Sequence, residues 1–248
     1  MDETLRLQYL EAMGIQVWLP RIRSFGQQNQ PMNVVGEVVP AVQIDQESTA
    51  ECGSLLEAGV ESSEDRWKEL ETRVAACTAC ELHATRTQTV FGTGCHNAKW
   101  MVIGEAPGAS EDQQGKPFVG RAGQLLTEML RALGLKREEV FIANLLKCRP
   151  PNNRDPKPNE VDACEGFLKQ QVAMIKPKII LAAGRIAAQN LLKTDAPIGR
   201  LRGRVHRYGD IPLVVVYHPA YLLRSPLEKR KAWEDLQLAM ATVEACEK

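Results

Sequence analysis

The chain has 248 residues, 44% of them hydrophobic, so it is long enough for one large domain, or for one domain with an extension. Its 31 basic and 31 acidic residues cancel, and its overall charge therefore neither demands nor excludes a polyanionic partner. No apolar stretch approaches the roughly 20 residues of a membrane-spanning helix and no signal-peptide pattern opens the chain, which predicts a cytoplasmic protein without membrane contact.

Residues 1–66 are predicted to form an extension. Apolar residues from Leu5 to Ile15 recur roughly at helical spacing, and Pro20 ends the pattern, which indicates a short amphipathic helix. From about residue 24 to residue 63 the chain is rich in Gln, Glu, Ser and Gly without any period, as is typical of a flexible linker. Helical order is expected to resume near Ser63, and we assign the folded domain to residues 67–248.

Beyond the linker, apolar runs typical of strands alternate with helical patterns. The expected strands are 100–103, 140–146, 179–182 and 213–217, and the expected helices are 63–76, 122–133, 160–175, 186–192 and 227–246. Continuous apolar strands separated by helices predict an α/β fold, a three-layer αβα sandwich with a mostly parallel sheet of about four strands. A site is then expected beyond the carboxyl ends of the strands.

The first candidate loop is Gly104-Glu105-Ala106-Pro107-Gly108, which follows an expected strand. Its glycines allow a tight turn that could present backbone N–H groups to a planar or anionic ligand. The loop has neither the Gly-Lys-Ser/Thr ending of a P-loop nor a dinucleotide fingerprint. An ordinary strand-ending turn explains it equally well.

Phe118 and Asn144 are candidates for holding a base. Phe118 lies in a loop rather than on a periodic face, where an aromatic ring could stack on a base or could plug the edge of the core. Asn144 lies inside an apolar run, where its amide needs partners and could read the edge of a pyrimidine or could bond to neighbouring backbone.

A third group of candidates follows the last expected strand. His218 is well placed there to polarise a carbonyl, and Pro219 helps to fix it in a turn. Leu222 and Leu223 beside Arg224 suit an apolar wedge in a base stack with a cation for the phosphate, or they begin the terminal helix.

Cysteine and basic residues complete the set of candidates. Seven cysteines without a secretion signal favour thiols or metal ligands over disulfides, and the pairs Cys77/Cys80 and Cys148/Cys164 suit either a zinc site or an iron–sulfur cluster, with spacing alone favouring zinc. Basic residues gather in two segments that could bind phosphates: Lys147, Arg149, Arg154 and Lys157, and then Arg200, Arg202, Arg204 and Arg207.

In their order and spacing, these motifs resemble those of the family 4 uracil-DNA glycosylases. The resemblance rests on Cys77-x2-Cys80, GEAPG at 104–108, KPFVGRAGQLL at 116–126, NLLKCRPPNNRDPKPNE at 144–160, Cys164 and HPAYLLR at 218–224. It implies a [4Fe-4S] cluster on Cys77, Cys80, Cys148 and Cys164, in place of zinc. It also implies that the enzyme flips uracil out of DNA and hydrolyses its N-glycosidic bond, leaving an abasic site for base excision repair.

The resemblance further implies roles for the candidate residues. Uracil would stack on Phe118, be read by Asn144 and lie against the backbone of Gly104 to Ala106, while His218 would donate to a ring carbonyl. Glu105 is the nearest carboxylate for the attacking water, because Ala106 stands where the best-known branch of the superfamily has an aspartate. Two alternatives are a non-catalytic zinc-dependent nucleic-acid-binding module and a relative that acts on another deaminated base, such as hypoxanthine or xanthine.

The resemblance does not cover the extension. The segment Gln16-Val17-Trp18-Leu19-Pro20 loosely resembles the short Gln-x-x-Leu peptides that dock on sliding clamps, so a protein contact is expected there. Nothing in the sequence points to an obligate assembly, and we expect a monomer.

Overall fold

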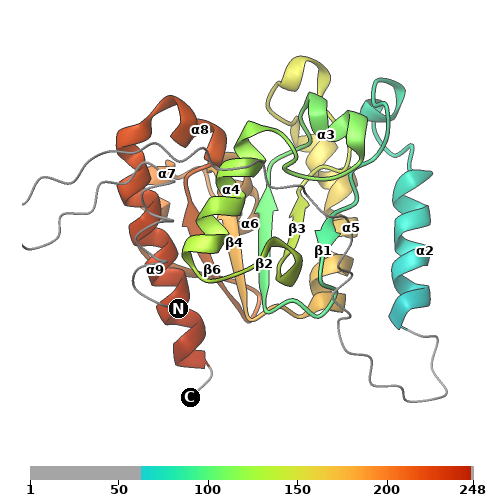
Figure 1. The fold of residues 1–248 in the computed structure, drawn as a ribbon. Coiled ribbons are helices and arrows are strands. Elements are labelled where there is room, and N and C mark those ends of the chain that lie inside the picture. The colour runs from blue at the N-terminus through green and yellow to red at the C-terminus, as the bar shows by residue number, and fades with distance from the viewer. Residues whose placement is uncertain (1–62, 247–248) are drawn as a thin grey trace, which may run out of the picture.

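The computed structural model describes residues 63–246, so the helix and linker expected before residue 63 lie outside the described residues. Described helices and strands alternate along most of the chain, as Figure 1 shows, and they form three layers with the sheet in the middle. None of the helices in residues 63–246 combines the length and the apolarity needed to cross a membrane.

The sheet has six strands in the order β1-β3-β2-β4-β6-β5. They are β1 (Thr93–Gly94), β2 (Trp100–Gly104), β3 (Phe141–Asn144), β4 (Ile179–Ala183), β5 (Val205–Tyr208) and β6 (Ile211–Val216). β3, β2, β4 and β6 are mutually parallel, while β1 and β5 pair antiparallel at the two edges. The predicted αβα sandwich is therefore confirmed, and the expected number of strands is corrected from about four to six.

Helices cover both faces of the sheet. They are α2 (Ser63–Ala75), α3 (Ala109–Gln114), α4 (Arg121–Ala132), α5 (Pro158–Ile175), α6 (Arg185–Leu192), α7 (Ile198–Leu201), α8 (Pro219–Arg224) and α9 (Lys229–Cys246), with short 3-10 turns η1 (Glu81–Ala84), η2 (Arg137–Glu139), η3 (Pro151–Asn153) and η4 (Pro226–Glu228). One core cluster joins α4, α8 and α9 to the sheet, and the other joins α2, α5, α6 and α7 to its opposite face.

The apolar strands supply both clusters because successive side chains of a strand point to opposite faces. In β2, Trp100 and Val102 enter the first cluster, whereas Met101 and Ile103 enter the second. Every residue of β2 is buried, which is why its sequence is continuously apolar rather than alternating.

Candidate active site and cysteine cavity

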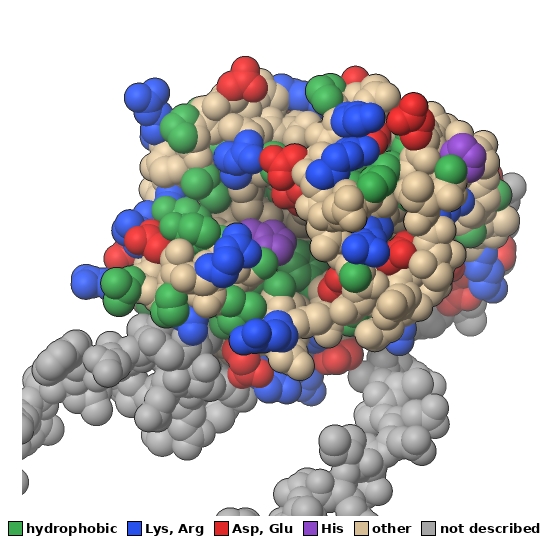
Figure 2. All heavy atoms as spheres, turned by 90° about the horizontal axis from the view of Figure 1, so that it is seen from above, with side chains coloured by type: hydrophobic (Ala, Val, Ile, Leu, Met, Phe, Trp, Pro, Cys, Tyr) green, Lys and Arg blue, Asp and Glu red, His purple; other side chains and the backbone are tan. Residues whose placement is uncertain are grey.

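The carboxyl ends of β2 and β3 lie side by side and carry the first two candidates. Gly104 pairs with Asn144 in the parallel register, and the ladder continues as the N–H groups of Leu145 and Leu146 donate to the carbonyls of Gly104 and Glu105 at 3.0 and 3.1 Å. This edge of the sheet faces the viewer in Figure 2, where basic side chains surround a hollow near the middle of the face.

Phe118 closes over the same point. A Cβ atom built on Gly104 would lie 2.8 Å from the Phe118 ring and would also collide with Oδ1 of Asn144, so only glycine fits there. The Phe118 backbone has φ of 53°, a left-handed conformation that is uncommon for an aromatic residue. The ring is therefore held in place by its surroundings, which is typical of functional sites.

Two side chains that the sequence analysis did not single out hold the Phe118 loop. The Glu111 carboxylate accepts from the backbone N–H groups of Val119 and Gly120 at 2.9 and 3.1 Å, and from that of Gly108 at 3.2 Å. Arg137 donates to the carbonyls of Pro117 and Phe118 at 2.7 and 3.1 Å. Glu111 lies three residues after Gly108, at the N3 position of helix α3, where a capping box was the available signal. Arg137 lies 19 residues after Phe118, and no local pattern identifies it.

Asn144 is 2% exposed, and its Oδ1 atom is buried without a hydrogen-bond partner. An unsatisfied buried acceptor costs about 1–3 kcal/mol, so its persistence calls for a ligand that donates to it. The amide thus has an unused acceptor directed at the space between Gly104 and Phe118.

His218 lies at the end of β6 and joins this group. Its ring is 5.6 Å from that of Phe118, centroid to centroid, at an interplanar angle of 30°. Its Nδ1 atom accepts from the N–H of Ala220 at 3.1 Å, capping α8, so in the neutral ring the proton is on Nε2. Burial, aided by the charge of Arg224, lowers the pKa of His218 to about 4, and the ring is a neutral Nε2–H donor at neutral pH.

Gly184 explains how His218 comes so close to the neighbouring strand. It follows β4 with φ of +97°, and a Cβ atom built on it would lie 2.9 Å from the Cβ of His218. Sequence reasoning did not identify this glycine, although its place directly after an apolar strand was the available signal.

Glu105 borders the site and is half-buried. Burial, with a contribution from Asp155, raises the pKa of Glu105 to about 7, against the opposing effect of Arg185. Such a carboxyl group can accept a proton near neutral pH.

The structure separates the two predicted wedge leucines. Leu222 is 1% exposed and belongs to the core cluster under α4 and α9, so its side chain is not free to enter a base stack. Leu223 is 36% exposed and is followed by the exposed Arg224. Both leucines belong to α8 rather than to the terminal helix, which begins at Lys229.

The four predicted cysteine ligands line one small cavity. Cys77 and Cys80 come from the segment after α2, Cys148 follows β3 and Cys164 lies in α5. Among residues 63–246, no three His, Cys, Asp or Glu side chains are grouped closely enough to hold a single metal ion. Four thiols that line one cavity are ligands that either a zinc ion or an iron–sulfur cluster can take.

Two of these sulfur atoms already receive hydrogen bonds. Arg86 Nη1 donates to the Cys148 sulfur at 3.1 Å, and the Lys147 backbone N–H donates to the Cys164 sulfur at 3.3 Å. Such donors stabilise thiolates that ligate iron. Ala106 packs against the cysteine cluster, so the cavity adjoins the loop after β2.

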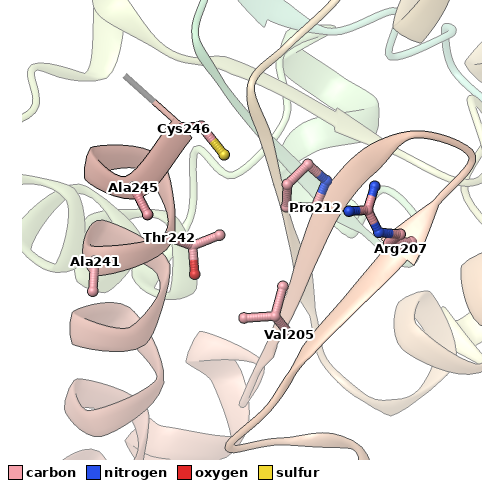
Figure 3. Close-up of a pocket in the computed structure, with 7 residues that line it drawn as sticks. All are labelled: Val205, Arg207, Pro212, Ala241, Thr242, Ala245 and Cys246. Carbon is pink, nitrogen blue, oxygen red and sulfur yellow. The ribbon is translucent and has the colours of Figure 1, made fainter. Parts of the chain in front are cut away.

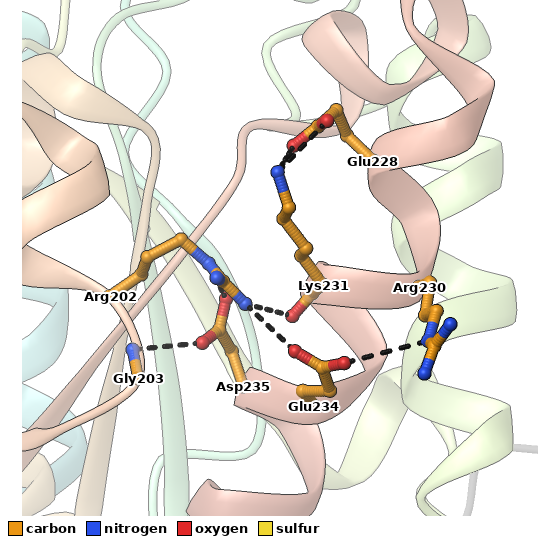
Figure 4. Close-up of polar contacts among 7 residues, drawn as sticks. All are labelled: Arg202, Gly203, Glu228, Arg230, Lys231, Glu234 and Asp235. Carbon is orange, nitrogen blue, oxygen red and sulfur yellow. Dashed lines mark hydrogen bonds and ion pairs between the residues drawn. The ribbon is translucent and has the colours of Figure 1, made fainter.

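Several basic residues expected to bind phosphates have internal partners instead. Figure 4 shows Arg202 turned to α9, where it meets the buried Asp235 at 2.9 Å and the carbonyl of Lys231 at 2.5 Å. Arg154 is paired with Glu160, and Lys147 is buried. Arg200 and Arg204 remain exposed.

A separate groove lies at the other end of the sheet. Figure 3 shows the residues that line it: Val205 and Arg207 from β5, Pro212 from β6, and Ala241, Thr242, Ala245 and Cys246 from α9. It adjoins the first residues of β6, whereas the candidate site adjoins the last, so the groove is not part of that site.

Comparison with known proteins agrees with this geometry. Residues 91–237 match the family model of the Uracil DNA glycosylase superfamily. A type-4 uracil-DNA glycosylase of Archaeoglobus fulgidus is 47% identical over 161 residues, which are 62% of this chain and 81% of that protein. A type-4 uracil-DNA glycosylase of Pyrobaculum aerophilum is 42% identical over 179 residues, 69% of this chain and 91% of that protein.

The fold and the site therefore define a member of the uracil-DNA glycosylase superfamily. A type-5 uracil-DNA glycosylase of Pyrobaculum aerophilum is 31% identical over 145 residues, which are 51% of this chain and 63% of that protein. Since identity to the type-4 proteins is higher and extends over more of their length, the chain belongs to the type-4 uracil-DNA glycosylase family.

Proposed function

We propose that this protein removes uracil from DNA by hydrolysing the bond between the base and its deoxyribose, leaving an abasic site for repair. Its family membership supports this activity. The structural observation that carries the proposal is the buried, unpartnered Oδ1 atom of Asn144, facing an aromatic ring and a bare glycine backbone.

Uracil fits the chemistry of this pocket. Its N3–H group can donate to Oδ1 of Asn144 while its O4 atom accepts from the same amide, and its ring can stack on Phe118. Cytosine has an acceptor at N3, which would face the Oδ1 acceptor and leave both atoms without a hydrogen. The pocket thus distinguishes the deaminated base from its parent.

The chemical step needs a donor for the departing base. As the bond from C1′ to N1 breaks, its electron pair moves into the uracil ring and negative charge collects on the ring oxygens. The Nε2–H of His218 donates to O2 of the ring and stabilises this charge without transferring a proton. Water attacks C1′, and the proton that it loses passes to the Glu105 carboxylate, so uracil leaves as the anion.

The target base must first leave the duplex, because its glycosidic bond is not accessible in the stack. Flipping costs a few kcal/mol, less for a U·G mismatch or a single strand. Leu223 is an exposed apolar residue of α8 that can fill the vacated space, and Arg224 supplies a cation for a phosphate.

We also propose that Cys77, Cys80, Cys148 and Cys164 hold a [4Fe-4S] cluster. Their shared cavity and the N–H donors to two sulfurs support this assignment. The cluster would supply a covalent cross-link among the segment after α2, the loop after β3 and helix α5. It would have no redox role, because hydrolysis of the glycosidic bond transfers no electrons. The type-4 relatives disfavour a non-catalytic zinc module.

The decisive experiment uses the purified full chain, with its iron and acid-labile sulfide measured, on labelled oligonucleotides. We expect release of uracil from U·G, U·A and single-stranded substrates, and strand cleavage only after alkali. Parallel substrates with hypoxanthine and xanthine test the alternative base preference. A cluster-loaded protein that leaves every uracil substrate intact would contradict the proposal.

Three further assignments belong to this proposal. The extension, residues 1–66, would carry a sliding-clamp contact at Gln16 to Pro20, and a peptide of residues 1–24 that fails to bind the clamp would refute it. A thiolate-ligated cluster suits the reducing cytoplasm. The catalytic domain, residues 67–248, would act as a monomer.

A further inference from the structure

Lys147 is a buried lysine that the proposed reaction does not use. It is 1% exposed, and its ammonium group donates to the backbone carbonyl of Asn144 at 3.0 Å and to Oε1 of Gln171 at 2.7 Å. Both acceptors are neutral oxygens. Because a buried cation is costly, a residue in this position needs a reason to be lysine rather than an apolar side chain.

The backbone of Lys147 is tied to the cysteine cavity. Its N–H donates to the Cys164 sulfur at 3.3 Å, and its carbonyl accepts from the N–H of Val90 at 2.8 Å. Gln171, the second partner of the ammonium group, donates in turn to the carbonyl of Phe91 at 2.9 Å. One residue therefore connects the end of β3, helix α5, the segment 90–91 and the cavity.

We propose that Lys147 is a positioning residue that orients Asn144 for uracil. The ammonium group holds the Asn144 carbonyl, and so fixes the peptide from which the amide extends toward Phe118. Because the backbone N–H of the same residue donates a hydrogen bond to the Cys164 sulfur, a displacement of the cysteine site would also displace the side-chain amide of Asn144. This inference rests on the proposed uracil-DNA glycosylase activity.

The alternative is a purely structural role, in which Lys147 only stabilises the fold. A double-mutant cycle separates the two, because residues that act through one another have non-additive effects. The variants are Lys147→Met, Asn144→Ala and the double variant. The measurements are single-turnover uracil excision at saturating enzyme, iron and sulfide content, and thermal unfolding.

Misplacement of a binding group by about 1 Å can cost on the order of 100-fold in rate, so we expect Lys147→Met to slow excision about 10- to 100-fold with its iron content unchanged. In the Asn144→Ala background the same change should cost less than about threefold. The matched control is Lys169→Met, which removes an exposed lysine of α5 that pairs with Glu165 and should leave excision unchanged.

Three results would overturn the inference: excision by Lys147→Met at the unaltered rate, losses that multiply in the double variant, or loss of iron together with activity. Should Lys147→Met fail to fold, Gln171→Met decides instead, because it removes one acceptor and leaves the bond to Asn144. That variant should slow excision about 3- to 10-fold, again only when Asn144 is present. If the unaltered chain does not excise uracil, it is the proposed activity that fails.

Discussion

The site is assembled from residues whose special properties are local. Asn144 keeps an unused acceptor, Phe118 adopts a left-handed backbone, and His218 uses Nδ1 as an acceptor to cap α8. The first two features have a cost when no ligand is bound, whereas the third is a stabilising cap. Together they preorganise the site for the edge of a planar pyrimidine, which lowers the conformational entropy that is lost when the base binds.

Replacing His218 with alanine tests the donor role. We expect the single-turnover excision rate to fall about 100- to 1000-fold, as is usual when one donor to a developing oxyanion is lost. Loss of the α8 cap should lower the free energy of unfolding by about 0.5–2 kcal/mol, while binding to uracil-containing DNA should change little. A variant that retains the unaltered rate would exclude His218 as the donor.

The pH dependence tests Glu105. Its raised pKa of about 7 means that the carboxylate able to accept a proton from water accumulates as pH rises from 6 to 8, so excision should accelerate over that range and then level off. Protonation of His218, whose pKa is about 4, contributes nothing above pH 5. Glu105→Gln should be slow and should lose this pH step; an unchanged profile would assign the step to another group.

Among the secondary-structure elements, the strands that are buried on both faces of the sheet were the easiest to predict from the sequence. The runs that form β2, β3, β4 and β6 were recognisable because central parallel strands are continuously apolar. β1 has only two residues, and β5 alternates between exposed and half-buried positions at an edge, so neither has that pattern. These two edge strands account for the error in strand number.

The candidate site was predicted in part for the same reason. Gly104, Asn144 and His218 follow central strands, whose carboxyl ends meet at one edge of the sheet. The exposure of Leu222, Lys147 and Arg202 depends on tertiary contacts with α4, α5 and α9. A sequence pattern does not encode those contacts. All three are therefore candidates for DNA contact in the sequence, although the structure gives them internal partners.

Substitutions in helix α8 can distinguish the core role of Leu222 from the proposed wedge role of Leu223. Leu222→Ala should lower the free energy of unfolding by about 2–5 kcal/mol, because a buried leucine is removed from the core. Leu223→Ala should cost less than about 0.5 kcal/mol and should slow excision from duplex DNA more than from single strands. Chemical denaturation and paired excision assays measure both. Equal excision by Leu223→Ala on both substrates would exclude the wedge role.

At the scale of the whole molecule, the cysteine cavity lies where three separate parts of the fold meet. The segment after α2, the loop after β3 and helix α5 each contribute thiols, while α2 itself packs on the sheet through the buried Trp67, which stacks on His96 at 4.2 Å. A cluster in this cavity would join α2 to the domain covalently.

Loss of one ligand tests that arrangement. We expect Cys164→Ala to lose iron and sulfide, to lose its brown colour and to unfold at a lower temperature, since the cross-link among the three segments is gone. Cys246→Ala, which removes an exposed cysteine at the end of α9, is the control and should retain all three properties. Full iron content in Cys164→Ala would remove this residue from the ligand set.

The close approach of Gly184 to His218 has a practical consequence. Any side chain at position 184 would meet both a φ of +97° and the Cβ of the histidine, so the donor would be pushed aside without being changed itself. A methyl group at position 184, directly after β4, would leave Phe118, Asn144 and α8 with their own side chains. Under the proposed function, such a variant would bind uracil-containing DNA without excising the base, and could serve as a probe for uracil in genomic DNA.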